Sequence, residues 1–122
     1  MVKILLARAE VDPDKPDKWG RTPLLLAAKY GREEVVKVLL GGEKVNPDKP
    51  DNQGRTPLSH AAWWGREGVV KILLGREDVS PDKPDNKGRT PLFFAAQGEH
   101  EEVVKTLLGR KDVSPDKSDN YG

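Results

Sequence analysis

The side chains that could take part in catalysis or metal binding are two histidines and a large set of carboxylates. His60 and His100 are the only histidines, and neither has ligand-like spacing to the other or to a pair of carboxylates. Asp82 and Asp85 stand in a proline-rich segment that lacks the order of acids, glycine and terminal glutamate of a calcium loop. There is no cysteine, no phosphate-binding glycine loop and no Gly-x-Ser-x-Gly elbow. The sequence therefore predicts no enzyme, no metal site and no cofactor.

The charge balance excludes further classes of function. The 122 residues include 21 lysines and arginines and 20 acidic residues, which gives a net charge of +1. We therefore expect neither nucleic-acid nor membrane-surface binding, because both require an excess or a stripe of basic residues. No run approaches the length of an apolar membrane span, and the opening Met-Val-Lys-Ile-Leu-Leu-Ala is too short for a signal peptide. These features favour an intracellular protein, in the cytoplasm or another internal compartment.

The architecture follows from two motifs that recur every 34 residues. One reads Asp-x-x-Gly-Arg-Thr-Pro-Leu and the other Val-Val-Lys-x-Leu-Leu-Gly. Their full copies begin at Asp17, Asp51 and Asp85 for the first motif and at Val35, Val69 and Val103 for the second. We therefore predict one domain over residues 1–122, composed of a partial unit 1–16, repeats 17–50, 51–84 and 85–118, and a partial finger 119–122.

Each repeat predicts a pair of helices. The first helix begins after Thr22, Thr56 or Thr90, because threonine is a good N-cap and the proline that follows it suits the first helical position. Leu58, Ala61 and Ala62 then share one face of the helix in the second repeat.

A glycine at position 31 or 65 ends the first helix, and the second helix opens with glutamates that suit its positive end. Gly41, Gly75 and Gly109 predict left-handed C-terminal caps on the second helices.

The segment that links one repeat to the next is predicted to be extended. Residues 79–88 contain two prolines, which cannot continue a helix and do not suit a central strand. An excursion that turns back near Asn86-Lys87-Gly88 fits this pattern, and we call it a finger. No such unit can bury its apolar face alone, so the units must stack.

At these residues the sequence resembles the ankyrin repeat family, whose pattern is D-x-x-G-x-T-P-L-H-x-A-A-x-x-G followed by a Val/Leu-rich helix. The Pro-Asp-Lys-Pro-Asp-Asn finger is similar to those of long ankyrin arrays in fungal proteins. The resemblance implies an all-α ankyrin-repeat α-solenoid with three full helix pairs, extended or β-hairpin fingers and partial terminal units. It also implies a concave face, made of fingers and first helices, that binds a partner protein.

The sequence departs from the family pattern in three ways. Its period is 34 residues where 33 is usual; the link after the second helix is shorter by one residue and the finger longer by two. The histidine of the pattern is replaced in each unit by Leu25, Ser59 or Phe93, so packing or the Ser59 hydroxyl must replace its hydrogen bonds. Glu99 stands where the other units have glycine, so this turn is expected to be a weak point. Two arrangements are open: Glu99 takes the left-handed conformation that glycine has in the other units, or the turn shifts by one residue and uses Gly98.

The candidate partner-binding residues are those that do not copy themselves from unit to unit, together with the arginine that follows each finger glycine. They are Trp19, Arg21, Tyr30, Gln53, Arg55, Trp63, Trp64, Lys87, Arg89 and Tyr121. Trp and Arg dominate interface hot spots, so an aromatic binding patch centred on Trp63 and Trp64 is one interpretation. The other is that these two residues cover the base of the neighbouring finger and contribute only to stability. Phe93 and Phe94 are predicted to belong to the core.

Two functions remain open from the sequence. One is a protein–protein interaction module whose partner binds the finger and first-helix face. The other is an engineered or consensus-like ankyrin scaffold with no native ligand, which the close copying between units allows. A consensus design would carry polar terminal caps, and their absence favours a piece of a natural array.

Apolar residues near both ends predict self-association. No further helical unit stands beside the apolar residues of either end in the sequence, and terminal repeats normally need a polar outer face. These residues are Val2, Ile4, Leu5 and Leu6 at one end and Val103, Val104, Leu107 and Leu108 at the other. We expect end-to-end contacts at millimolar concentration, measured as a rise in apparent mass by light scattering. A strictly monomeric protein at that concentration would contradict this expectation.

Overall fold

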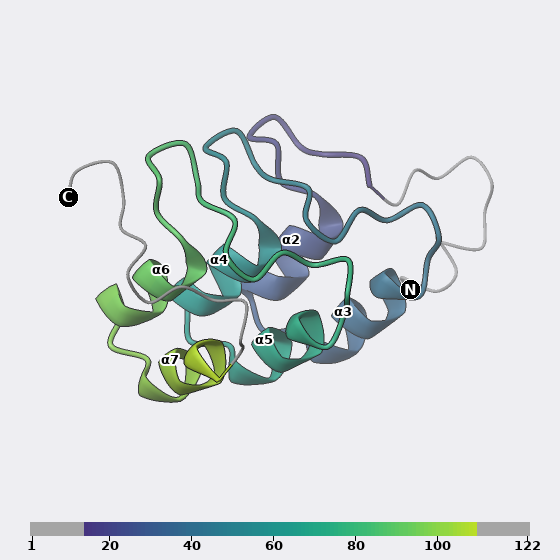
Figure 1. Cartoon of the computed structure of the whole chain (residues 1–122). Coiled ribbons are helices and arrows are strands. Elements are labelled where there is room, and N and C mark those ends of the chain that lie inside the picture. Colours follow the sequence, from purple (N-terminus) through teal and green to yellow (C-terminus); the bar gives the residue numbers. More distant parts are fainter. Residues whose placement is uncertain (1–13, 110–122) are drawn as a thin grey trace.

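The computed structural model describes residues 14–109, and this part of the chain contains six helices and no strand. The helices are α2 (Pro23–Lys29), α3 (Glu33–Leu40), α4 (Pro57–Trp63), α5 (Glu67–Leu74), α6 (Pro91–Gln97) and α7 (Glu101–Leu108). They form two rows, α2, α4 and α6 in one and α3, α5 and α7 in the other, with the fingers projecting beyond the first row (Figure 1). Each pair packs against the next, as expected of a solenoid.

The first helices begin where the threonines predict. The buried hydroxyl oxygens of Thr22, Thr56 and Thr90 each accept a hydrogen bond, 3.2 Å long, from the backbone N–H three residues later. In the second unit this hydroxyl also lies 3.1 Å from that of Ser59. Ser59 thus forms a hydrogen bond at the position where the family pattern has histidine.

The core lies between the two rows. Leu58, Ala61 and Ala62 are completely buried, as their spacing on one face predicts, and α4 packs against both α2 and α6. The two alanines leave room for this close approach. Val70 and Leu73 bury the facing side of α5. Phe94 is also fully buried, which confirms its assignment to the core, while Phe93 is half-buried.

The turn between the helices of a pair requires a left-handed residue, and the next unit packs closely on it. Gly31 has φ +70°, Gly65 has φ +68° and Glu99 has φ +59°, so Glu99 takes the left-handed conformation in the third unit. A Cβ on Gly31 would lie 2.9 Å from the Arg66 side chain, and one on Gly65 would lie 2.5 Å from the His100 ring.

These two side chains, which occupy equivalent positions, also satisfy carbonyl groups at the ends of the preceding first helices. Arg66 donates from Nε to the Lys29 carbonyl at 3.0 Å, and His100 donates from Nε2 to the Trp63 carbonyl at 2.7 Å. His100 is therefore a structural residue that joins the second unit to the third.

The expectation of left-handed caps on the second helices was wrong. Gly41, Gly75 and Gly109 have φ values of −72°, −73° and −71°. The reason is that the helices tighten at their ends: Gly41 N–H approaches the carbonyls of both Lys37 and Val38 at 3.2 Å, and the following N–H bonds to Leu39 at 3.0 Å. These bonds satisfy the terminal carbonyls without a reversal of the chain.

The first, second and third fingers (residues 14–21, 45–55 and 79–89) are extended segments that do not form β-hairpins. Asn52 N–H donates to the Trp19 carbonyl at 3.0 Å and Asn86 N–H to the Gln53 carbonyl at 2.9 Å. The same asparagine side chains each donate a second bond to the finger before them, at 3.1 Å. Each pair of neighbouring fingers is thus joined by one backbone hydrogen bond, which does not amount to a β-ladder.

The prediction of three stacked helix pairs is therefore confirmed over residues 14–109. Most of the partial unit 1–16, the end of repeat 85–118 and the finger 119–122 lie outside the described residues, as do Val2, Ile4 and Leu5. The assignment of the whole chain to one domain stays a prediction.

The left-handed Glu99 should be a weak point that a single substitution repairs. Because a side chain in this conformation costs on the order of 1 kcal/mol, Glu99→Gly should raise the free energy of unfolding by up to about 1 kcal/mol in a urea titration. Gly98 must be retained, since a Cβ there would lie 2.7 Å from the His100 ring and 2.9 Å from the Trp63 carbonyl oxygen. The matched variant Gly65→Ala should lose stability; an unchanged midpoint in both would contradict the analysis.

Candidate functional site

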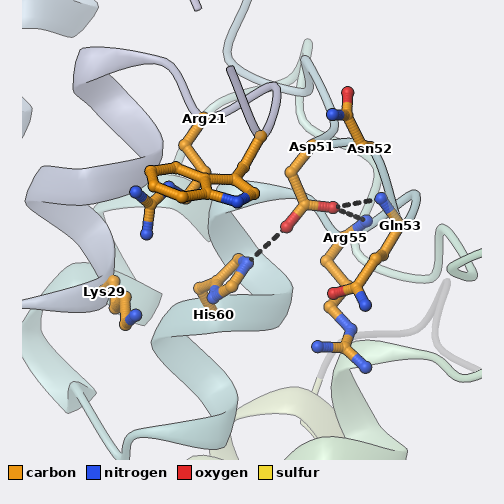
Figure 2. A pocket seen from close by; sticks show the side chains of 8 residues that line it. Arg21, Lys29, Asp51, Asn52, Gln53, Arg55 and His60 are labelled. Atoms are coloured by element: carbon orange, nitrogen blue, oxygen red, sulfur yellow. Dashed lines mark hydrogen bonds and ion pairs between the residues drawn. The ribbon is translucent and has the colours of Figure 1, made fainter. Parts of the chain in front are cut away.

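A hollow of about 370 Å³ lies where the first and second fingers meet helices α2 and α4. It is lined by Trp19, Arg21, Lys29, Asp51, Asn52, Gln53, Arg55 and His60. The labelled side chains in Figure 2 come from the two fingers and from helices α2 and α4. Four of the predicted partner-binding residues, Trp19, Arg21, Gln53 and Arg55, thus come together in one place.

Asp51 organises the inner wall of the hollow. One of its carboxylate oxygens accepts backbone bonds from Gln53 and Arg55 at 2.9 Å, and the other lies 2.9 Å from His60 Nε2 (Figure 2). Both side chains are largely buried, with 6% of Asp51 and 11% of His60 exposed. Burial lowers the pKa of His60 below its ordinary value, and the nearby charges of Lys29 and Arg55 act in the same direction, although the Asp51 bond opposes them.

His60 changes the ion pairing of the finger arginines. In the first and third fingers the arginine bonds to the aspartate four residues before it, Arg21 to Asp17 at 2.8 Å and Arg89 to Asp85 at 3.0 Å. In the second finger His60 occupies that carboxylate oxygen. Arg55 therefore reaches the aspartate of the next unit, with Nε 3.5 Å from the same Asp85 oxygen.

The predicted row of arginines is therefore held by the protein's own carboxylates and rings. Arg21 lies 4.4 Å from the Trp19 ring centre, Arg55 lies 5.1 Å from that of Trp63, and Arg89 lies 5.3 Å from that of Phe94. These are cation–π distances. The guanidinium groups hold the aromatic rings in place, and only part of each remains open to a partner.

The structure separates the two adjacent tryptophans. Trp63 stacks on Phe94 of the next unit, with ring centres 4.7 Å apart and planes 18° apart, and it is half-buried. The ring of Trp64 is 49% exposed and that of Tyr30 54%, and both lie beside Lys29, whose Nζ is 5.8 Å and 5.5 Å from their ring centres. Trp63 therefore packs within the stack, while Trp64 remains on the surface.

The remaining predicted residues are at the edge of this site or beyond the described residues. Lys87 is exposed at the tip of the third finger, and Tyr121 lies outside residues 14–109. The hollow also contains residues that the sequence did not single out as a site: Lys29, Asp51, Asn52 and His60. Lys29 could have been found, because its equivalents are Trp63 and Gln97; Asp51 could not, because it repeats in every unit.

As far as the structure describes the chain, the hollow lacks the side-chain groups of common catalytic and metal sites. Among the described residues that line it there is no serine, threonine or cysteine that His60 could activate. Within residues 14–109 no three His, Cys, Asp or Glu side chains gather closely enough to hold a metal ion. None of the helices in this range is long and apolar enough to cross a lipid bilayer.

The helix pairs, fingers and close stacking define a helical repeat solenoid. The sequence matches the family described as ankyrin repeats (3 copies) over residues 1–85, and ankyrin repeats (many copies) over residues 64–108. The chain belongs to the ankyrin repeat family, whose members are generally non-enzymatic modules that bind other proteins. No curated protein matches it.

The buried His60 should make folding sensitive to mild acid. Because its pKa is lowered in the folded chain, the unfolded chain binds a proton at higher pH, so the free energy of unfolding should fall as pH decreases from 7.5 to 5. His60→Gln, which keeps a donor for Asp51, should remove this contribution. The difference in the free energy of unfolding between the unaltered chain and His60→Gln, measured by urea titration at each pH, isolates the contribution of His60, because the two proteins share all other titratable groups. A difference that does not vary with pH would contradict the effect.

Proposed function

We propose that the chain is a non-enzymatic module that binds a partner protein across its finger and first-helix face, which comprises the three fingers and helices α2, α4 and α6. One observation carries this proposal. Of the four large hydrophobic side chains that are exposed in residues 14–109, Trp19 lies in the wall of the hollow, and Tyr30 and Trp64 lie beside Lys29, which also lines it. Exposed aromatics around a concave site are typical of a protein interface.

The polar groups support a recognition role. The hydrogen bonds of Asp51 and of the finger arginines fix the walls of the hollow in the free protein. A site that is already ordered loses less conformational entropy when its partner binds. The same bonds saturate the groups that a catalytic mechanism would need, which agrees with a non-enzymatic module.

Trp64 and Trp63 provide a test in which binding and stability separate. Trp64→Ala should weaken binding by about 2 kcal/mol, which is roughly 30-fold, and change the free energy of unfolding by less than about 0.5 kcal/mol, because the ring is half exposed. Trp63→Ala should instead cost about 2–3 kcal/mol of stability, because its stacking on Phe94 is lost.

The partner would first be captured from a lysate of the source organism, and its affinity for each variant measured by calorimetry beside a urea titration. Lys71→Ala, on the exposed side of α5 in the second row, is the control and should change neither quantity. A Trp64→Ala protein that binds as tightly as the unaltered chain would contradict the proposed face.

A further inference from the structure

The finger and first-helix face carries net positive charge although the chain as a whole is nearly neutral. Nine cations stand on it against six carboxylates. The cations are Lys15, Lys18, Arg21, Lys29, Lys49, Arg55, Lys83, Lys87 and Arg89, and the carboxylates are Asp14, Asp17, Asp48, Asp51, Asp82 and Asp85. Since the net charge of all 122 residues is only +1, this face holds more positive charge than its share of the chain.

Three of these carboxylates, Asp17, Asp51 and Asp85, are already used by the protein. Each accepts backbone N–H bonds from the residues two and four positions later in its own finger, at 2.8 to 3.0 Å. Their remaining oxygens bond to an arginine or to His60. Burial alone would raise the pKa of Asp85, but these backbone bonds and Arg89 lower it below its ordinary value.

Lys29 is the cation of the hollow that has no such partner. Among the described residues no carboxylate lies within 4 Å of its Nζ, which lies 5.5 Å and 5.8 Å from the ring centres of Tyr30 and Trp64. Its charge reaches the hollow, because it contributes to the lowered pKa of His60. Within residues 14–109 the hollow therefore has an ammonium group without a carboxylate partner and the exposed Trp19 ring in its wall, and two more exposed rings lie beside that ammonium group.

We propose that this hollow binds an extended acidic segment of the partner protein, with a carboxylate at Lys29 and neighbouring apolar side chains on Trp19 and Trp64. The volume of about 370 Å³ is at the small end of ligand sites and has room for roughly one or two side chains, as an extended segment would offer. This inference rests on the proposed function and specifies the chemistry of the partner.

A random twelve-residue peptide library, displayed on phage and selected on the whole chain at 50 mM salt, tests this proposal. The enriched peptides should carry net negative charge, and their affinity should fall several-fold between 50 and 300 mM salt. The Lys29→Glu substitution should weaken peptide binding at least tenfold. Lys71→Glu is the matched control: Lys71 also lies in the last turn of a helix, but in the second row, and its reversal should leave binding unchanged.

Two further measurements distinguish an effect on the binding site from an effect on the stability of the fold. The Lys29→Gln substitution removes the charge without reversing it and should also weaken peptide binding. The urea midpoint of this variant should stay close to that of the unaltered chain. In NMR titrations the Trp19 indole N–H and the His60 ring signals should shift when the peptide binds.

The outcomes distinguish this inference from the proposed function. Peptides that depend on Trp64 but are neutral or basic, or that ignore Lys29, would overturn the acidic segment and leave a binding face in place. Peptides that are insensitive to both residues would overturn both proposals. A single-stranded oligonucleotide that displaces an acidic peptide of equal charge and binds more tightly would overturn a protein segment as the ligand.

Discussion

The structure depends on the aspartate that precedes the turn of each finger. Asp17, Asp51 and Asp85 each hold two backbone N–H groups with one oxygen, and these bonds fix the turn that follows. The turn then presents its backbone to the asparagine of the next finger. The second oxygen of each aspartate determines where the arginine lies, and with it the nearby aromatic ring. One carboxylate thus connects local geometry, stacking and the shape of the face.

The two edges of each unit are joined to the next by different chemistry. At the fingers, asparagine bonds to the preceding backbone. At the ends of the first helices, Arg66 and His100 reach a carbonyl of the unit before, over a left-handed glycine that leaves space for them. The hollow lies between these two sets of bonds, so its walls are ordered from both sides. The exposed residues of the surface can therefore differ from unit to unit, while the hydrogen bonds that join the units on both sides of it are repeated.

The sequence predicted the repeats, the threonine caps and the buried alanines, because each depends on local chemistry that recurs with the period. It left open whether Glu99 or Gly98 takes the left-handed conformation, and the structure places it at Glu99. It failed at the second-helix caps, where short backbone bonds at the helix end replaced the left-handed glycine that the residue type suggested. It also missed Lys29 and the pair of His60 and Asp51. Asp51 and His60 belong to the same unit, but Asp51 repeats in every unit and a single histidine nine residues away carries no signal of the pairing. Lys29 could have been found, because its equivalents in the other units are Trp63 and Gln97.

The ion pair of Arg55 with Asp85 has a consequence for how the array opens. In a stack of units, stability is the sum of a term for each unit and a term for each boundary. When His60 displaces Arg55 from its own finger, one ion pair is removed from the term for the second unit and added to its boundary with the third. Melting of the third unit then breaks a bond of the second as well. The two units are thereby coupled into a larger cooperative block, and fraying from that side meets greater resistance at this boundary.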